Sequence, residues 1–297
     1  MRRRYYSEQP ISRLAIWARR IALFSLAATF VAVIIVRSGA LDIVPALSTL
    51  GGALVLACVA ILLAFGAAIV IWREGVGGGR HAVTALFIGL ALIAYPLFLG
   101  IKASHLPAIY DITTDPIDPP RFDAIARLRP RDANPITYAG LYAAEQQHAA
   151  YSDIEPDDTT STPQEAYDAA MKVIAKRKWR VVDARPPQGP LQAPLPRNID
   201  ARTAPSAAVR DGIIEAVART PILGFRDDVV VRVRATTDGA RIDIRSASRY
   251  GRHDLGTNAK RVRNLIDDID DVLALPPPVK KTPPPTQAAG KASPAKR

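Results

Sequence analysis

The sequence has one cysteine and very little charge over a long early stretch, and both absences restrict what the protein is. Cys58 has no second cysteine, which excludes an intrachain disulfide and a cysteine zinc site. The four histidines are scattered without metal-ligand spacing, and we expect neither a metal nor a cofactor. Between Arg20 and Lys102 there are only five charged residues: Arg37, Asp42, Arg73, Glu74 and Arg80.

The formal net charge of +11 comes from the two ends of the chain. Residues 1–101 carry nine Lys/Arg and three Asp/Glu, whereas residues 102–275 carry 25 of each. Residues 276–297 carry five Lys/Arg and no acid, and this Pro/Lys-rich tail is predicted to be disordered. A nucleic-acid-binding domain concentrates basic residues on a folded face. The neutral middle region therefore argues against nucleic acid as a partner.

Three apolar stretches follow a basic N-terminal segment, residues 1–20, and each is close to the roughly 20 residues that a bilayer requires. Within residues 21–101 we predict three transmembrane helices, at about 16–36, 50–72 and 82–101. A cleaved signal peptide is the alternative for the first stretch, because Ser38-Gly39-Ala40 offers small residues for cleavage. The predicted spans contain no Asp, Glu, Lys or His. Such groups mark ion and proton pathways, so a transporter is disfavoured.

The distribution of basic residues around the spans predicts their orientation, because cytoplasmic loops carry an excess of Lys and Arg. Eight arginines lie in the N-terminal residues 1–20 and between the second and third spans: Arg2, Arg3, Arg4, Arg13, Arg19, Arg20, Arg73 and Arg80. The other side has about three. We therefore expect a cytoplasmic N-terminus, with everything after Ile101 on the far side. The Ala/Arg-rich composition suggests a Gram-negative bacterium, which makes the bilayer the inner membrane and the far side the periplasm.

The remainder of the chain reads as one small domain preceded by an extended segment. Repeated X-Pro steps and apolar residues in 102–160 predict a segment that wraps over the domain. Within 161–275, a capping box at Thr162–Glu165 begins a helix, and another helix begins near Thr257. Strands are expected near 179–183, 212–219, 229–234 and 241–245. This order predicts an α+β domain with a four-stranded, mainly antiparallel sheet and two helices on one face.

The last two predicted strands form a hairpin across Asp238-Gly239, and their alternation leaves two registers open. A two-residue turn pairs Val233 with Ile244, whereas a four-residue loop pairs Val231 with Ile244. Both registers keep the apolar side chains on one face.

Three motifs in this region resemble the domain-of-unknown-function family numbered 1499. They are GFRDDV at 224–229, RSASRYG at 245–251 and DLGTN at 254–258, and the resemblance covers roughly residues 151–273. Upstream, residues 111–115 resemble a segment that precedes this domain in three-span members. Other members carry a cysteine motif near the domain start, which this chain lacks. The family's activity is unassigned, so the resemblance implies an architecture and no chemistry.

The same motifs contain the one group of polar side chains that suits a ligand. Two arginines beside hydroxyls and a helix start are suited to hold a carboxylate or phosphate. In the structural alternative, the acids of the group neutralise its arginines internally. No catalytic residue is predicted. The candidate ligand-binding residues are Arg245, Ser246, Ser248, Arg249, Asp227, Asp228, Asp254 and Asn258.

These observations leave three classes of function. The favoured one is a non-enzymatic inner-membrane protein that displays a periplasmic domain for binding a small anionic ligand or an envelope protein. The second is a hydrolase or transferase that acts on an envelope substrate through the Arg/Ser/Asp cluster. The third is an assembly subunit of a membrane complex.

Overall fold

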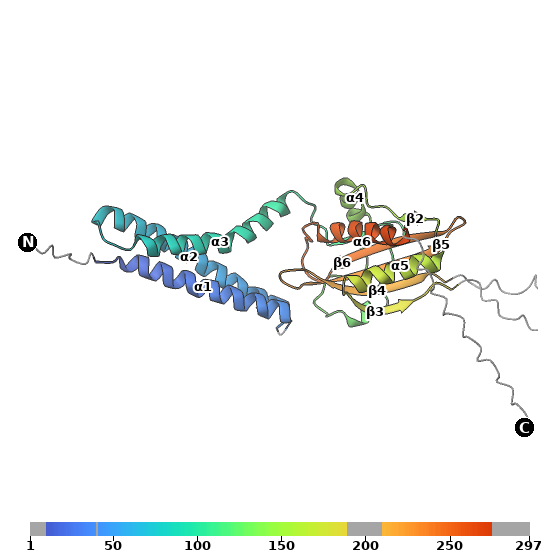
Figure 1. Ribbon diagram of the computed structural model, residues 1–297, viewed down its shortest axis with the longest axis horizontal. Coiled ribbons are helices and arrows are strands. Elements are labelled where there is room, and N and C mark those ends of the chain that lie inside the picture. The colour runs from blue at the N-terminus through green and yellow to red at the C-terminus, as the bar shows by residue number, and fades with distance from the viewer. Residues whose placement is uncertain (1–9, 40, 189–209, 275–297) are drawn as a thin grey trace, which may run out of the picture.

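The computed structural model describes residues 10–39, 41–188 and 210–274. Within them, three long helices form one part of the molecule and an α+β domain forms the other, and the two parts lie end to end (Figure 1). The predicted tail, residues 276–297, lies outside the described residues.

The first part consists of α1 (Arg13–Ser38), α2 (Ile43–Glu74) and α3 (Gly79–Ser104). All three are long and apolar enough to cross a membrane, as predicted. They pack against one another through small side chains, which include Ala18, Ala22, Ala60, Ala64 and Ala85. Large apolar side chains point outward instead: Phe30 is 67% exposed and Phe87 is 74% exposed. Small residues inside and large apolar residues outside are what packing in lipid requires.

The domain is built on an antiparallel sheet of six strands, so the prediction of four was too low. The order is β1-β6-β5-β4-β3, and β2 also pairs with β6. Strands β1 and β2 have three residues each, too short to show an alternating pattern. They form because the backbone of the preceding segment pairs with the free edge of β6. The strands are β1 (Asp111–Thr113), β2 (Asp157–Thr159), β3 (Arg180–Arg185), β4 (Gly212–Arg219), β5 (Arg226–Ala235) and β6 (Ala240–Ser248).

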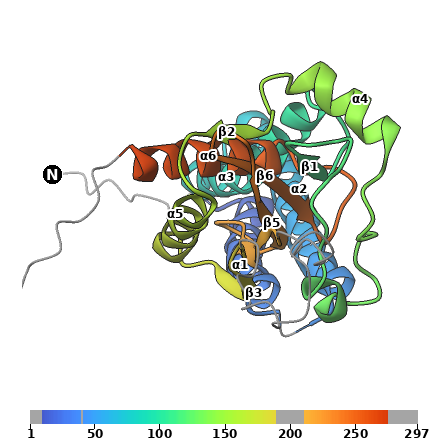
Figure 2. The same cartoon turned by 90° about the vertical axis from the view of Figure 1, so that its right-hand side faces the viewer.

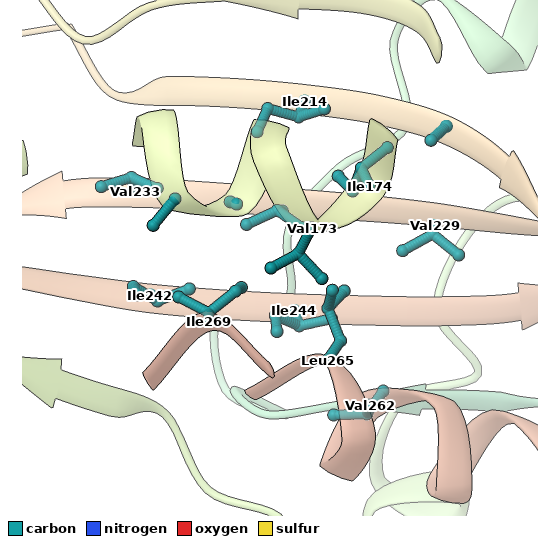
Figure 3. Close-up of a cluster of buried hydrophobic side chains, with 14 of the residues drawn as sticks. Val173, Ile174, Ile214, Val229, Val233, Ile242, Ile244, Val262, Leu265 and Ile269 are labelled. Carbon is teal, nitrogen blue, oxygen red and sulfur yellow. The ribbon is translucent and has the colours of Figure 1, made fainter. Parts of the chain in front are cut away.

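Helices α5 (Pro163–Lys176) and α6 (Thr257–Leu273) cover one face of the sheet, as predicted (Figure 2). The capping box is formed: Thr162 and Glu165 bond to each other's backbone N–H groups at the start of α5. Figure 3 shows the resulting core. It joins Val173, Ile174, Leu265 and Ile269 of the helices to Val229, Val233, Ile242 and Ile244 of the sheet.

The opposite face is covered by the segment between α3 and α5, which also contains η1 (Ile125–Leu128) and α4 (Leu141–Ala150). Phe122 and Ile125 pack there against Val217, Val230 and Ala247 of the sheet. We call residues 111–138 of this segment the covering segment. The sheet is therefore the middle layer of three.

The hairpin between β5 and β6 has the second of the two predicted registers. Val231 is opposite Ile244, which leaves four residues, 236–239, in the connection. Gly239 is needed at its end, because a Cβ atom there would lie 2.1 Å from the backbone oxygen of Thr159.

Candidate functional site

The sheet separates the eight predicted site residues, because neighbouring residues of a strand point to opposite faces. Asp228, Arg245 and Arg249 lie on the face under the covering segment. The helix-covered face holds Asp227, Ser246, Ser248 and Asn258, while Asp254 precedes α6. The residues that were predicted to form one cluster therefore belong to two networks of polar side chains, one on each face of the sheet.

Under the covering segment, each arginine has a carboxylate partner. Arg249 lies 2.7 Å from Asp228, and Arg129 of the covering segment contacts the same carboxylate at 2.9 Å. Arg245 forms two hydrogen bonds with Asp111 of β1, at 2.9 and 2.7 Å. Burial raises the pKa of both Asp111 and Asp228, and their arginine partners act in the opposite direction. These pairs attach the covering segment, which begins with β1, to strands β5 and β6.

On the helix-covered face, the hydroxyl and amide groups bond to one another. Ser246 donates to Asn258 at 2.8 Å, and the Asn258 amide donates to the Ser248 hydroxyl at 3.0 Å. Arg261 of α6 completes this network, because it donates to Ser246 and pairs with Asp227. Sequence reasoning missed Arg261, although it follows Asn258 by three residues and so shares its side of α6.

Asp254 caps the start of α6. Its carboxylate accepts the backbone N–H groups of Gly256, at 3.0 Å, and Asn258, at 2.7 Å. Burial raises the pKa of Asp254, and these two hydrogen bonds lower it in part. The negative charges of the acids in both networks are thus compensated by arginines or by backbone N–H donors. The structural alternative, in which the acids and arginines of the motifs pair internally, requires such an arrangement.

A cleft of about 420 Å³ connects the motif residues with the candidate membrane helices. Its lining comes from the start of α2, the last part of α3 and the nearest loops of the domain. We call this space the junction cleft. One wall is apolar and consists of Ile43, Leu47, Tyr95, Phe98 and Leu99. The other wall includes three of the predicted site residues, Asp227, Ser248 and Asp254, together with Ile222 of the β4–β5 connection.

Direct contacts fix the domain to the helices beside this cleft. Arg37, at the end of α1, donates to the carbonyl oxygens of Pro221 and Ile222. The His253 ring nitrogen Nε2 lies 3.1 Å from the carbonyl oxygens of Ala103 and Leu106. Gly224, the first residue of the GFRDDV motif, has a φ of +70°, and a Cβ atom there would lie 3.0 Å from Arg37 Cγ. The motif glycine thus allows the close approach of the domain to α1.

Basic side chains that form no ion pair within the described part of the chain lie at the junction cleft. Arg226 and Lys102 line it, and Arg219 is directly opposite Arg226 in the pairing of β4 with β5. Burial lowers the pKa of Arg226, and the nearby positive charges of Arg219, Arg249 and Arg180 add to this effect. Sequence reasoning missed this feature: Arg226 lies within the GFRDDV motif but was not selected, and Arg219 lies outside the three motifs.

Comparison with known proteins confirms the resemblance. Residues 111–269 match the model of a family described as a protein of unknown function (DUF1499), which is more than half of the chain. The match begins at β1, upstream of the three motifs, and so includes the covering segment. No curated protein and no solved structure matches the chain.

Proposed function

The chain belongs to the DUF1499 family, and from that premise we propose that it is a non-enzymatic binding protein of a bacterial inner membrane. In this proposal the three helices anchor the chain and the α+β domain lies in the periplasm. The ligand occupies the junction cleft, where the domain meets the membrane.

The observation that carries the proposal is the composition of the junction cleft. Its apolar wall comes from the candidate membrane helices. Its opposite wall comes from the domain and includes the motif residues Asp227, Ser248 and Asp254. Ligand sites are mostly apolar cavities with a few polar groups that fix orientation, and they occur where two parts of a protein meet. The contacts of Arg37 and His253 hold these walls together, which supports a site formed before the ligand binds.

A periplasmic domain is supported by the arginine asymmetry. Arg73 and Arg80 flank the α2–α3 connection. This connection adjoins the N-terminal end of α1, since the backbone N–H of Ser12 donates to the carbonyl oxygen of Gly77. The domain follows the end of α3, which lies at the opposite end of the helices from the α2–α3 connection. The arginine excess favours a cytoplasmic position for the basic side, and an odd number of spans would then put the domain across the membrane.

The alternative of a hydrolase or transferase has less support from the geometry. Ser246 is fully buried and its hydroxyl bonds to Asn258 and Arg261. A nucleophile needs a neighbouring general base to activate it. An asparagine and an arginine do not serve as one, so the contacts of Ser246 favour a structural role.

Native mass spectrometry of the full chain, released from a mild detergent, tests the proposal. We expect a bound small molecule on the wild-type protein and its loss from Ile222→Trp, which places a larger side chain at the junction cleft. Ile117→Trp is the matched control, because Ile117 is 97% exposed and does not line this cleft. Equal occupancy in all three proteins, or none in the wild type, would contradict ligand binding at this position and favour an assembly subunit.

A further inference from the structure

We infer that the ligand of the junction cleft is an anionic phospholipid. Its headgroup phosphate lies at Arg226 and Arg219, and its acyl chains lie along α2 and α3. This inference rests on the proposed function, since it specifies the chemical class of the molecule in the same cleft.

The first argument is an uncompensated positive charge. Arg219 and Arg226 are directly opposite each other on β4 and β5, so their side chains leave the same face of the sheet. Like charges in this arrangement repel and destabilise a strand pair. Both side chains are exposed, and neither forms an ion pair within the described residues. Arg180, at the start of β3, adds a third positive charge nearby.

A phosphate group would turn this repulsion into attraction. Guanidinium groups bind phosphate through two parallel hydrogen bonds, and two arginines side by side offer several such donors. Lys102, at the end of α3, adds a positive charge at the cleft. The carboxylates of Asp227 and Asp254 also line the cleft, but Arg261 and the backbone at the start of α6 already compensate them. The net charge that the cleft presents is therefore positive.

The second argument identifies the anion as a lipid. The apolar wall continues onto the outer surface of the helices, because Phe98 lines the cleft and is also 59% exposed. Ile222 faces the same cleft from the domain side and is 47% exposed. A soluble anion would gain nothing from this apolar surface. A phospholipid would bury its chains there while its headgroup reaches the arginines at the membrane surface.

Thermal unfolding of the full chain in detergent micelles tests the inference. The added probes are phosphatidylglycerol, phosphatidylcholine and inorganic phosphate, each over a concentration series. We expect phosphatidylglycerol to raise the melting temperature of the wild type by mass action, and the other two probes to leave it unchanged. Arg226→Gln should weaken the apparent affinity for phosphatidylglycerol about tenfold, as for one lost charged hydrogen bond.

The matched control is Arg127→Gln, since Arg127 is exposed and does not line the junction cleft. It should bind phosphatidylglycerol like the wild type. Without lipid, Arg226→Gln should melt at the wild-type temperature or slightly above it, because the repulsion with Arg219 is removed. A clearly lower value would show that Arg226 is structural and would overturn the inference.

The remaining outcomes separate this inference from the proposed function. If phosphatidylcholine stabilises the protein as much as phosphatidylglycerol does, the ligand does not require an anionic headgroup. If inorganic phosphate does so, the ligand does not have to be a lipid. Both outcomes overturn this inference but remain consistent with the proposed function, ligand binding at the junction cleft. A different, uncharged molecule on the purified protein would likewise overturn the lipid and keep the proposed function. If no probe stabilises the wild type and nothing co-purifies, both proposals fail.

Discussion

Asp111 and Arg245 form a buried two-point ion pair that joins β1 to β6 across 134 positions of sequence. Their side chains are only 2% and 3% exposed. The guanidinium group also lies over the ring of Phe122, 4.8 Å from its centre, and donates to the carbonyl oxygens of Pro120 and Ile136. Arg245 therefore connects the sheet to the covering segment at several points.

Replacement of Arg245 by alanine should be strongly destabilising, because it leaves the carboxylate of Asp111 buried without its partner. Loss of one member of a buried pair costs roughly 3 to 5 kcal/mol. For a domain of this size, we expect the melting temperature to fall on the order of 10 °C in a thermal scan. The double variant with Asp111→Ala should lose less than the sum of the two single variants. A stable Arg245→Ala protein would contradict the structural role of this pair.

Glu215 has a comparable role that is visible only in the folded protein. Its side chain is fully buried, and its two carboxylate oxygens accept the backbone N–H groups of Asp123, Ala124 and Ile125 at 2.8 to 3.0 Å. These donors lie at the start of η1, where the backbone N–H groups have no partner within the helix. The carboxylate of Glu215 thus holds the start of η1 against β4 of the sheet.

Glu215→Gln should weaken this attachment, because an amide has one acceptor oxygen and carries no charge. We expect a loss of about 2 kcal/mol, in the range of hydrogen bonds to a charged group. Hydrogen exchange should accelerate in residues 121–128 more than in α5, which packs on the other face. Uniform acceleration across the domain would contradict a local role in holding η1. Thr162→Ala, which removes the cap of α5, is the control and should accelerate exchange in that helix instead.

The sequence predicted those parts of the fold that depend on local pattern. The three apolar runs, the capping box before α5 and the alternation of β5 with β6 each concern residues close together in the chain. Strands β1 and β2 were missed because three residues contain no pattern, and they exist only through pairing with β6.

The site was predictable only in part, for a similar reason. The motifs identified Asp227, Ser248 and Asp254, which do line the junction cleft. Nothing local, however, reveals that this wall faces α2 and α3, because that depends on how the domain is held by Arg37 and His253. The partners Arg129 and Glu215 were missed as well, since their contacts join residues about 100 positions apart.

The proposed orientation predicts the activity of reporter fusions in a bacterial host. Alkaline phosphatase fused after Leu273, the last residue of α6, should be active, because the enzyme requires the periplasm. The same reporter inserted at Gly78, between α2 and α3, should be inactive, because the flanking arginines keep that connection in the cytoplasm. Reversed activities would contradict both the orientation and the periplasmic position of the domain.

Two carboxyl groups face each other between β2 and α6, on the edge of the domain. Burial, followed by the negative charge of Asp270, raises the pKa of Asp157 to about 6. Burial also raises the pKa of Asp270. Between about pH 4 and pH 6 the folded protein thus holds a proton that the unfolded chain has already released. The stabilisation linked to this proton is complete below the ordinary Asp pKa of 3.8 and is lost as the pH rises through about 6.

Asp157→Asn should therefore stabilise the protein at pH 7.5 and have little effect at pH 4.5, because asparagine carries no charge that must be buried. The two groups are partly exposed and solvent screens them, so we expect a gain of a few degrees in melting temperature. The adjacent Asp158 is a matched control of opposite sign, since its hydrogen bonds with Arg241 lower its pKa. Asp158→Asn should reduce the melting temperature at pH 7.5, and this difference should vanish at low pH. Thermal scans of the wild type and both variants between pH 4 and 8 measure these differences directly. If Asp157→Asn gives the same difference at every pH, the two carboxyl groups do not share a proton in the folded protein.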